Sequence, residues 1–140
     1  MPTLPQPDEL TSLVLRTDFS DDTAWTALKA AIDSFDEQRR ATYVSDPAYA
    51  GMAVHALVDA DAAAGDDDQP RWLFVADTTT MTDEEHSLLA VDLYHEPGRT
   101  FRVPPAGYPV VSDNLNVANM TFAEFADETD DSGTCRGFTT

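Results

Sequence analysis

Residues 71–105 contain three of the five strands that the sequence predicts, in the segment RWLFVADTTTMTDEEHSLLAVDLYHEPGRTFRVPP. Residues 72–76 form a continuous apolar run, which is typical of a strand covered on both faces. Leucine and valine then alternate with alanine and aspartate over residues 89–93. The polar segment 95–98 separates this run from a second alternating run at residues 99–103. This pattern predicts an antiparallel hairpin.

The N-terminal half of the chain predicts two strands, each followed by a helix. The strands are expected at residues 13–15 and 41–45, where apolar side chains cluster. Ser20 is expected to cap a helix that ends near Asp36, because the apolar residues between them recur at steps of three and four. A second amphipathic helix is expected over residues 50–64.

The C-terminal half predicts short helices joined by turns. Residues 82–85 and 121–124 both have the sequence of a capping box, in which a hydroxyl and a carboxylate satisfy each other's backbone donors. The prolines of residues 104–109 are expected to exclude regular structure. Helices are therefore predicted near residues 82–85, over residues 110–119, and from the second capping box to about Glu128.

Together these elements predict one α/β domain of three layers, with a mixed sheet that has a mainly parallel centre and an antiparallel hairpin at its edge. The domain is expected over residues 12–128, with a flexible arm at 1–11 and a tail at 129–140. We expect the apolar faces of these elements to form the core, which would contain Leu13, Leu15, Trp25, Leu28, Ile32, Val44, Leu57, Leu73, Val75, Leu89, Val91, Phe101, Val103, Leu115, Phe122 and Phe125.

The composition limits the partners and the location of the protein. The chain has 26 acidic and 8 basic residues, for a formal net charge of -18. Such a charge repels nucleic acid and anionic membranes, so neither is an expected partner, whereas a basic protein surface is. No apolar run has the length of a membrane span or a signal peptide. The single cysteine, Cys135, excludes an internal disulfide and favours a cytoplasmic location.

Three aspartates follow predicted strands and are the main candidates for a site. They are Asp18, Asp46 and Asp77. In open α/β sheets the ligand crevice lies beyond the carboxyl ends of the strands, so these carboxylates are expected at one edge. There they could bind Mg²⁺ or a similar cation, or raise one another's pKa for acid–base catalysis. The simpler interpretation is that they cap turns and helices.

The arginines near the strands are candidates for binding an anion. Arg16, Arg99 and Arg102 lie on or beside predicted strands, where a guanidinium group could bind a carboxylate or phosphate of a small ligand. The alternative is that they form internal ion pairs, with Asp18 or Asp92 as partners.

Other catalytic signatures are absent from the sequence. The three histidines, His55, His86 and His95, lack metal-ligand spacing. No phosphate-binding loop, dinucleotide fingerprint or nucleophile elbow occurs, so we expect no cofactor.

Four segments carry a resemblance to a known family: residues 15–19, 85–93, 98–102 and 114–122. On these segments the chain resembles a family of small acidic proteins of high-GC soil bacteria, which is classed as a domain of unknown function. The resemblance covers nearly the whole chain. It implies a bacterial cytosolic protein and assigns no activity, cofactor or site residue.

Two classes of function follow. The leading hypothesis is a non-catalytic protein-interaction or regulatory module that binds a basic protein surface. The alternative is a small, metal-assisted enzyme acting on a small anionic substrate at the carboxyl ends of the strands. In that enzyme Asp18 and Asp77 would be metal ligands or acid and base, and Arg16 or Arg102 would hold the substrate.

Overall fold

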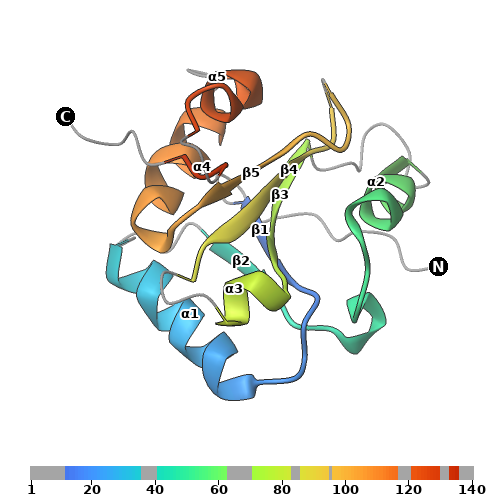
Figure 1. Cartoon of the computed structure of the whole chain (residues 1–140), viewed down its shortest axis with the longest axis vertical. Helices are drawn as coiled ribbons and strands as arrows, with labels where there is room; N and C mark the ends of the chain where they lie inside the picture. Colours follow the sequence, from blue (N-terminus) through green and yellow to red (C-terminus); the bar gives the residue numbers. More distant parts are fainter. Residues whose placement is uncertain are drawn as a thin grey trace.

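The protein has one five-stranded sheet, in the order β2-β1-β3-β4-β5. The computed structural model describes residues 12–35, 41–62, 71–82, 86–94, 96–116, 121–129 and 133–135. The strands are β1 (Ser12–Arg16), β2 (Ala41–Val44), β3 (Trp72–Ala76), β4 (Leu88–Asp92) and β5 (Thr100–Val103). Figure 1 shows the sheet between its helices.

The sheet is mixed, and its direction changes at β3. Strand β1 is parallel to β2 and β3, whereas β4 is antiparallel to β3 and β5. The predicted α/β class and the β4–β5 hairpin are therefore confirmed. The middle strand β3 has one parallel and one antiparallel neighbour. A parallel β4 would need a long crossover, but the segment between β3 and β4 contains only a short helix among its described residues, α3 (Thr78–Thr82).

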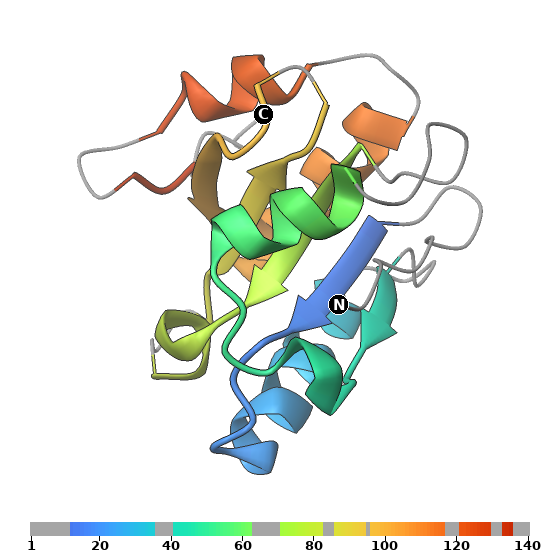
Figure 2. The ribbon, with the colours of Figure 1, turned by 90° about the vertical axis from the view of Figure 1, so that its right-hand side faces the viewer.

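Alternate residues of the strands face two separate hydrophobic clusters. Val14 and Phe74 belong to the cluster that receives side chains from α1 (Asp22–Phe35), α4 (Tyr108–Asn116) and α5 (Phe122–Ala126). Their neighbours on the opposite face, which include Leu13, Leu15, Leu73 and Val75, pack with residues of α2 (Val54–Ala62). Figure 2 looks onto the face that α2 crosses. Burial on both faces explains the continuous apolar runs of β1 and β3.

The predicted core is buried with two exceptions. Val44 and Leu89 are only partly buried, at the margin of the second cluster. Val44 lies on β2, at an outer position in the sheet order, where fewer neighbours cover a side chain. The structure also buries residues that the predicted core left out, and the bulkiest of them include Val14, Phe74 and Tyr108.

Two predictions about the N-terminal half are wrong in detail. Asp21, not Ser20, caps α1, because its carboxylate accepts the Ala24 amide at 3.0 Å. The helix predicted over residues 50–64 is also shorter. A 3₁₀ turn, η1 (Pro47–Tyr49), comes first, and α2 begins only at Val54.

The helices of the C-terminal half differ from the prediction at two places. Thr82 ends α3 instead of capping a helix, and Glu85 lies outside the described residues. The prolines do not exclude helix, since the 3₁₀ turn η3 (Pro105–Gly107) leads directly into α4, which starts at Tyr108. Proline at the second helical position is tolerated because the first-turn amides have no intrahelical acceptor. Thr121 caps α5 as predicted, because its hydroxyl accepts the Glu124 amide; the same hydroxyl also donates to the Glu124 carboxylate at 3.4 Å.

Part of the predicted tail pairs with the sheet. The amide of Arg102 donates to Gly133 at 2.9 Å, and the amide of Cys135 donates to Arg102 at 2.7 Å. Cys135 is buried in the first cluster. Within the described ranges, no helix has both the length and the apolar character needed to cross a bilayer.

Candidate functional site

The carboxyl ends of β1 and β3 lie side by side at one edge of the sheet. Because the two strands pair in parallel, Asp18 and Asp77 leave them at the same edge. Thr78, which follows Asp77, lies near enough to Asp18 for its side chain to help lower the pKa of that carboxyl group. The structure thus brings the two predicted residues close together. We call the group formed by Arg16, Asp18, Asp77 and Arg102 the strand-end site.

Asp77 is bound by an arginine from β5. Nη1 and Nη2 of Arg102 lie 2.9 Å and 2.8 Å from the two carboxylate oxygens, a bidentate geometry. The amide and hydroxyl of Thr80 lie 3.1 Å and 3.0 Å from Oδ1. Asp77 therefore caps α3 and forms an ion pair at the same time. Both side chains of the pair are largely shielded, with 20% and 27% of their surface exposed.

The hydrogen bonds of Asp77 decide its charge. Burial alone would raise the pKa of Asp77, but the hydrogen bonds from Arg102 and Thr80 outweigh it, and the pKa lies below its ordinary value. The Ser20 hydroxyl and amide likewise lower the pKa of Asp18. The prediction that these carboxylates raise each other's pKa is therefore wrong. Both remain anions at neutral pH, which does not suit a general acid.

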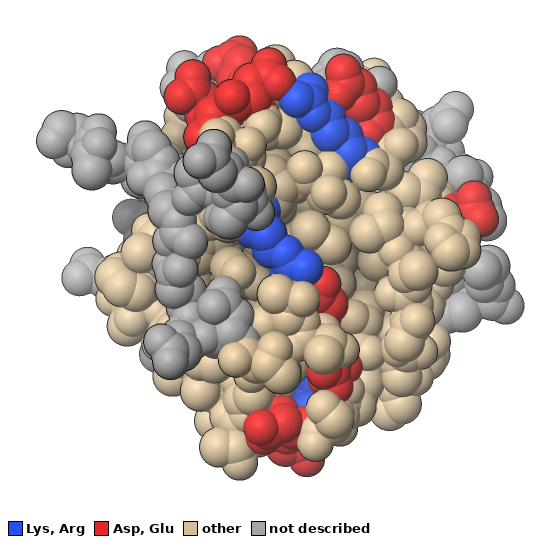
Figure 3. Space-filling view, in the orientation of Figure 1, with Lys and Arg blue, Asp and Glu red and all other residues tan. Residues whose placement is uncertain are grey.

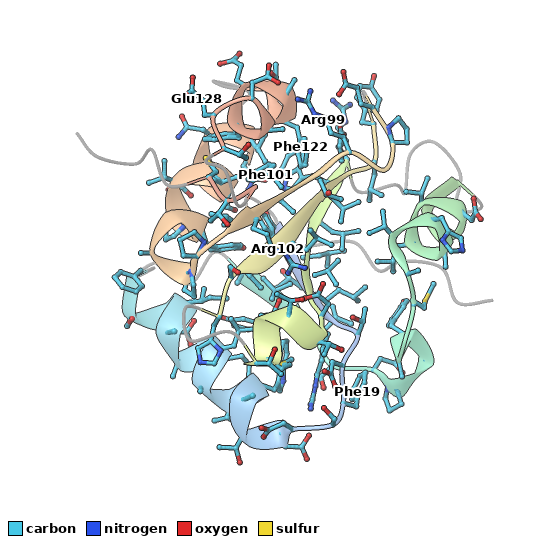
Figure 4. The ribbon with its side chains drawn as sticks, viewed as in Figure 1. Phe19, Arg99, Phe101, Arg102, Phe122 and Glu128 are labelled. Atoms are coloured by element: carbon cyan, nitrogen blue, oxygen red, sulfur yellow. The ribbon has the colours of Figure 1, made fainter. Side chains whose placement is uncertain are left out.

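Arg16 is buried, and nearby residues of the chain bind its guanidinium group. Its Nε donates to the carbonyl of Asp18 at 2.8 Å, and its Nη2 lies 2.8 Å from the Asp22 carboxylate. The guanidinium group stacks 4.5 Å from the centroid of Phe19, which Figure 4 labels. The arginines of the strand-end site thus form internal ion pairs, but with Asp22 and Asp77 instead of the side chains of Asp18 or Asp92.

Asp46 does not complete a metal site. Its carboxylate accepts the Ala48 amide at 2.9 Å and caps η1, so Asp46 is a capping residue. Among the residues that the structure describes, no three His, Cys, Asp or Glu side chains are grouped so that they could hold a metal ion.

His86, which lacks metal-ligand spacing in the sequence, lies beside the Asp77 end of the strand-end site. Its Nδ1 lies 3.1 Å from the carbonyl oxygen of Thr80. Since a carbonyl can only accept, Nδ1 carries the proton, and the ring caps the end of α3. The backbone φ of His86 is 52°, a left-handed conformation that is uncommon outside glycine.

A second group of polar residues surrounds the loop between β4 and β5, at the opposite end of the hairpin. We call it the hairpin-loop surface, and it consists of Arg71, Tyr94, Glu96, Arg99 and Asp127. Arg99 pairs with both Glu96 and Asp127. The hydrogen bonds from Arg99 to Asp127 and Glu96 raise the pKa of Arg99. Figure 3 shows basic side chains flanked by acidic ones at the α5 end of this face.

The sequence pointed to Arg99 but not to the surface around it, because no local motif marks that surface. Tyr94 is a further local signal, an aromatic residue at the boundary between a strand and a charged loop. Arg71 and Asp127 are far from that loop in the sequence, so only the fold brings them to it.

The mixed sheet and the helices that pack against it define a small α/β protein. The chain belongs to the family described as a domain of unknown function (DUF6924), whose family model matches residues 11–138. The resemblance to an uncharacterised family is thereby confirmed. No curated protein matches the chain.

Proposed function

We propose that the protein is a non-catalytic protein-interaction or regulatory module that binds a basic protein surface. The hairpin-loop surface is the observation that carries this proposal. Its carboxylates are more than half exposed, at 55% for Glu96 and 68% for Asp127. Glu124 and Glu128 are exposed on and beside the same helix, α5. Exposed acidic side chains around an exposed aromatic ring suit a basic partner.

The scaffold supports this proposal. Hydrophobic clusters on both faces of the sheet are consistent with a rigid three-layer domain, which presents surface loops in fixed positions. A cytoplasmic setting fits the buried Cys135, because a chain with a single cysteine cannot form an internal disulfide, and such chains suit reducing conditions.

The first test is capture of partners from a native lysate by matched charge-reversal variants. Asp127→Lys places a positive charge on the hairpin-loop surface, whereas Asp59→Lys makes the same change on the exposed side of α2. We expect Asp127→Lys to lose the partners that wild type captures at low salt, and Asp59→Lys to keep them. Equal capture by both variants would contradict the role of this surface.

The strand-end site supports the second candidate, a small metal-assisted enzyme, only through the proximity of Asp18 and Asp77. Their carboxylates are already bound by Ser20 and Arg102. We therefore expect that adding Mg²⁺ or Ca²⁺ leaves the melting temperature unchanged. An ion that binds only the native state must stabilise it, by about 2.7 kcal/mol at 100 times its Kd. A concentration-dependent rise in differential scanning fluorimetry would contradict this expectation and favour the enzyme.

A further inference from the structure

The hairpin-loop surface already holds one arginine against an aromatic ring. The guanidinium carbon of Arg71 lies 4.7 Å from the centroid of Tyr94. The Tyr94 side chain is nevertheless 54% exposed, one of the few large hydrophobic residues on the described surface. Aromatic rings in such positions often anchor a partner at an interface.

The same surface holds a second arginine between two carboxylates. Arg99 Nη1 lies 2.9 Å from Glu96, and Nη2 donates to Asp127. Glu96 is on the loop and Asp127 directly follows α5, so two separate segments hold one guanidinium group. Two arginines of the protein itself thus make the two contacts by which proteins recognise arginine. Arg71 stacks on an aromatic ring, and Arg99 pairs with carboxylates.

Hydrogen bonds hold the described residues of this loop, 93–94 and 96–99, in place before any partner arrives. Asp92 is buried, and its two carboxylate oxygens accept the amides of Tyr94 and Glu96 at 2.9 Å and 3.0 Å. Gly98 donates to the carbonyl of Asp92 at 2.8 Å and has a φ of 94°, which glycine adopts without strain. A loop that is already ordered loses little entropy on binding.

We infer that the hairpin-loop surface binds arginine side chains of a basic partner protein, with Tyr94 as the stacking platform. This inference rests on the function proposed above and names the chemistry that the partner must present. Charge complementarity favours a basic occupant. The two carboxylates of the surface balance its two arginines, and Glu124 and Glu128, which are exposed on and beside α5, add a negative excess next to it. Arginine is favoured over lysine because its planar group both stacks on a ring and binds carboxylates through two hydrogen bonds.

Two synthetic peptides test the inference, one with arginine and one with lysine at every basic position. We expect the arginine peptide to bind the whole chain roughly three- to tenfold more tightly in isothermal titration calorimetry. Tyr94→Ala should remove this preference, and Tyr94→Phe should keep it because the aromatic face remains. Equal affinities of wild type for the two peptides would overturn the inference while leaving the proposed function intact. If neither peptide binds, both fail.

Substitution of Arg71 provides a control that should raise the affinity for the arginine peptide instead of lowering it. Since Arg71 lies on the Tyr94 ring and repels an incoming cation, Arg71→Ala should bind the arginine peptide about two- to fivefold more tightly than wild type. A variant that only disturbed the fold would bind more weakly. Weaker binding by a folded Arg71→Ala variant, judged by an unchanged circular dichroism spectrum, would contradict the assignment of the ring as the platform.

Discussion

Phe101→Ala is expected to lower the free energy of unfolding by roughly 3–5 kcal/mol. The ring is 3% exposed and lies 4.9 Å from Phe122 and 6.3 Å from Phe125, measured between centroids. Figure 4 shows Phe101 and Phe122 close together between β5 and α5. Removing the ring leaves a cavity at this junction, which the surrounding side chains fill only in part. Denaturant unfolding followed by circular dichroism measures the change.

Phe35→Ala is the matched control for this substitution. Phe35 ends α1 with 55% of its surface exposed, so its removal should change the stability by no more than about 0.5 kcal/mol. Similar unfolding midpoints for the two variants would show that the contact between β5 and α5 is not part of the core.

Arg102→Gln is expected to destabilise the protein by about 1–3 kcal/mol at neutral pH. It removes the bidentate partner of Asp77 and leaves a partly buried carboxylate without its counter-charge. We place the effect below that of a fully buried pair, because both side chains retain some contact with water. Arg99→Gln is the control, since it breaks pairs with well-exposed carboxylates and should destabilise the protein clearly less than Arg102→Gln.

The effect of Arg102→Gln should depend on pH in one direction. The folded pKa of Asp77 lies below its ordinary value of 3.8, so the ion pair stabilises the protein fully above that value. The stabilisation is lost as the pH falls through the lowered folded pKa, because Asp77 then takes up a proton. The stability difference between wild type and Arg102→Gln should therefore shrink in acid. A difference that is the same at neutral and acidic pH would show that Arg102 acts through packing and not through charge.

The strands were predictable because their signals are local and strong. The apolar run of β3 indicates a strand buried on both faces, and the alternation in β4 and β5 indicates strands with one apolar face. The structure has strands at these places. The positions of the helix caps were less predictable because several candidate residues compete. Asp21 caps α1 although Ser20 precedes it, and Asp77 caps α3 although Thr82 has the stronger sequence motif.

Contacts between distant segments could not be predicted from the sequence. The hydroxyl of Ser12 accepts the indole N–H of Trp72 at 2.8 Å and lies 2.8 Å from the hydroxyl of Ser112. These residues come from β1, β3 and α4, and nothing in their local sequence indicates a shared buried network.

The candidate site was predictable in its residues but not in its pairing. The crevice rule placed Asp18 and Asp77 at one edge, and the structure has them there. The partner of Asp77 depends on strand order and register. Arg102 lies opposite Leu89, and Leu89 opposite Val75, so the arginine crosses one strand to reach the end of β3. Because of that arrangement, Asp77, a candidate catalytic residue, forms an ion pair with Arg102.

The proposed interaction should depend on salt. We propose that exposed carboxylates of the hairpin-loop surface bind a basic protein, and exposed charges are screened over about 8–10 Å at physiological ionic strength. For a partner captured from the native lysate, we predict that the affinity measured by calorimetry falls steadily as salt is raised, and that Asp127→Lys abolishes binding at low salt. An affinity that is unchanged by salt and by Asp127→Lys would contradict the account.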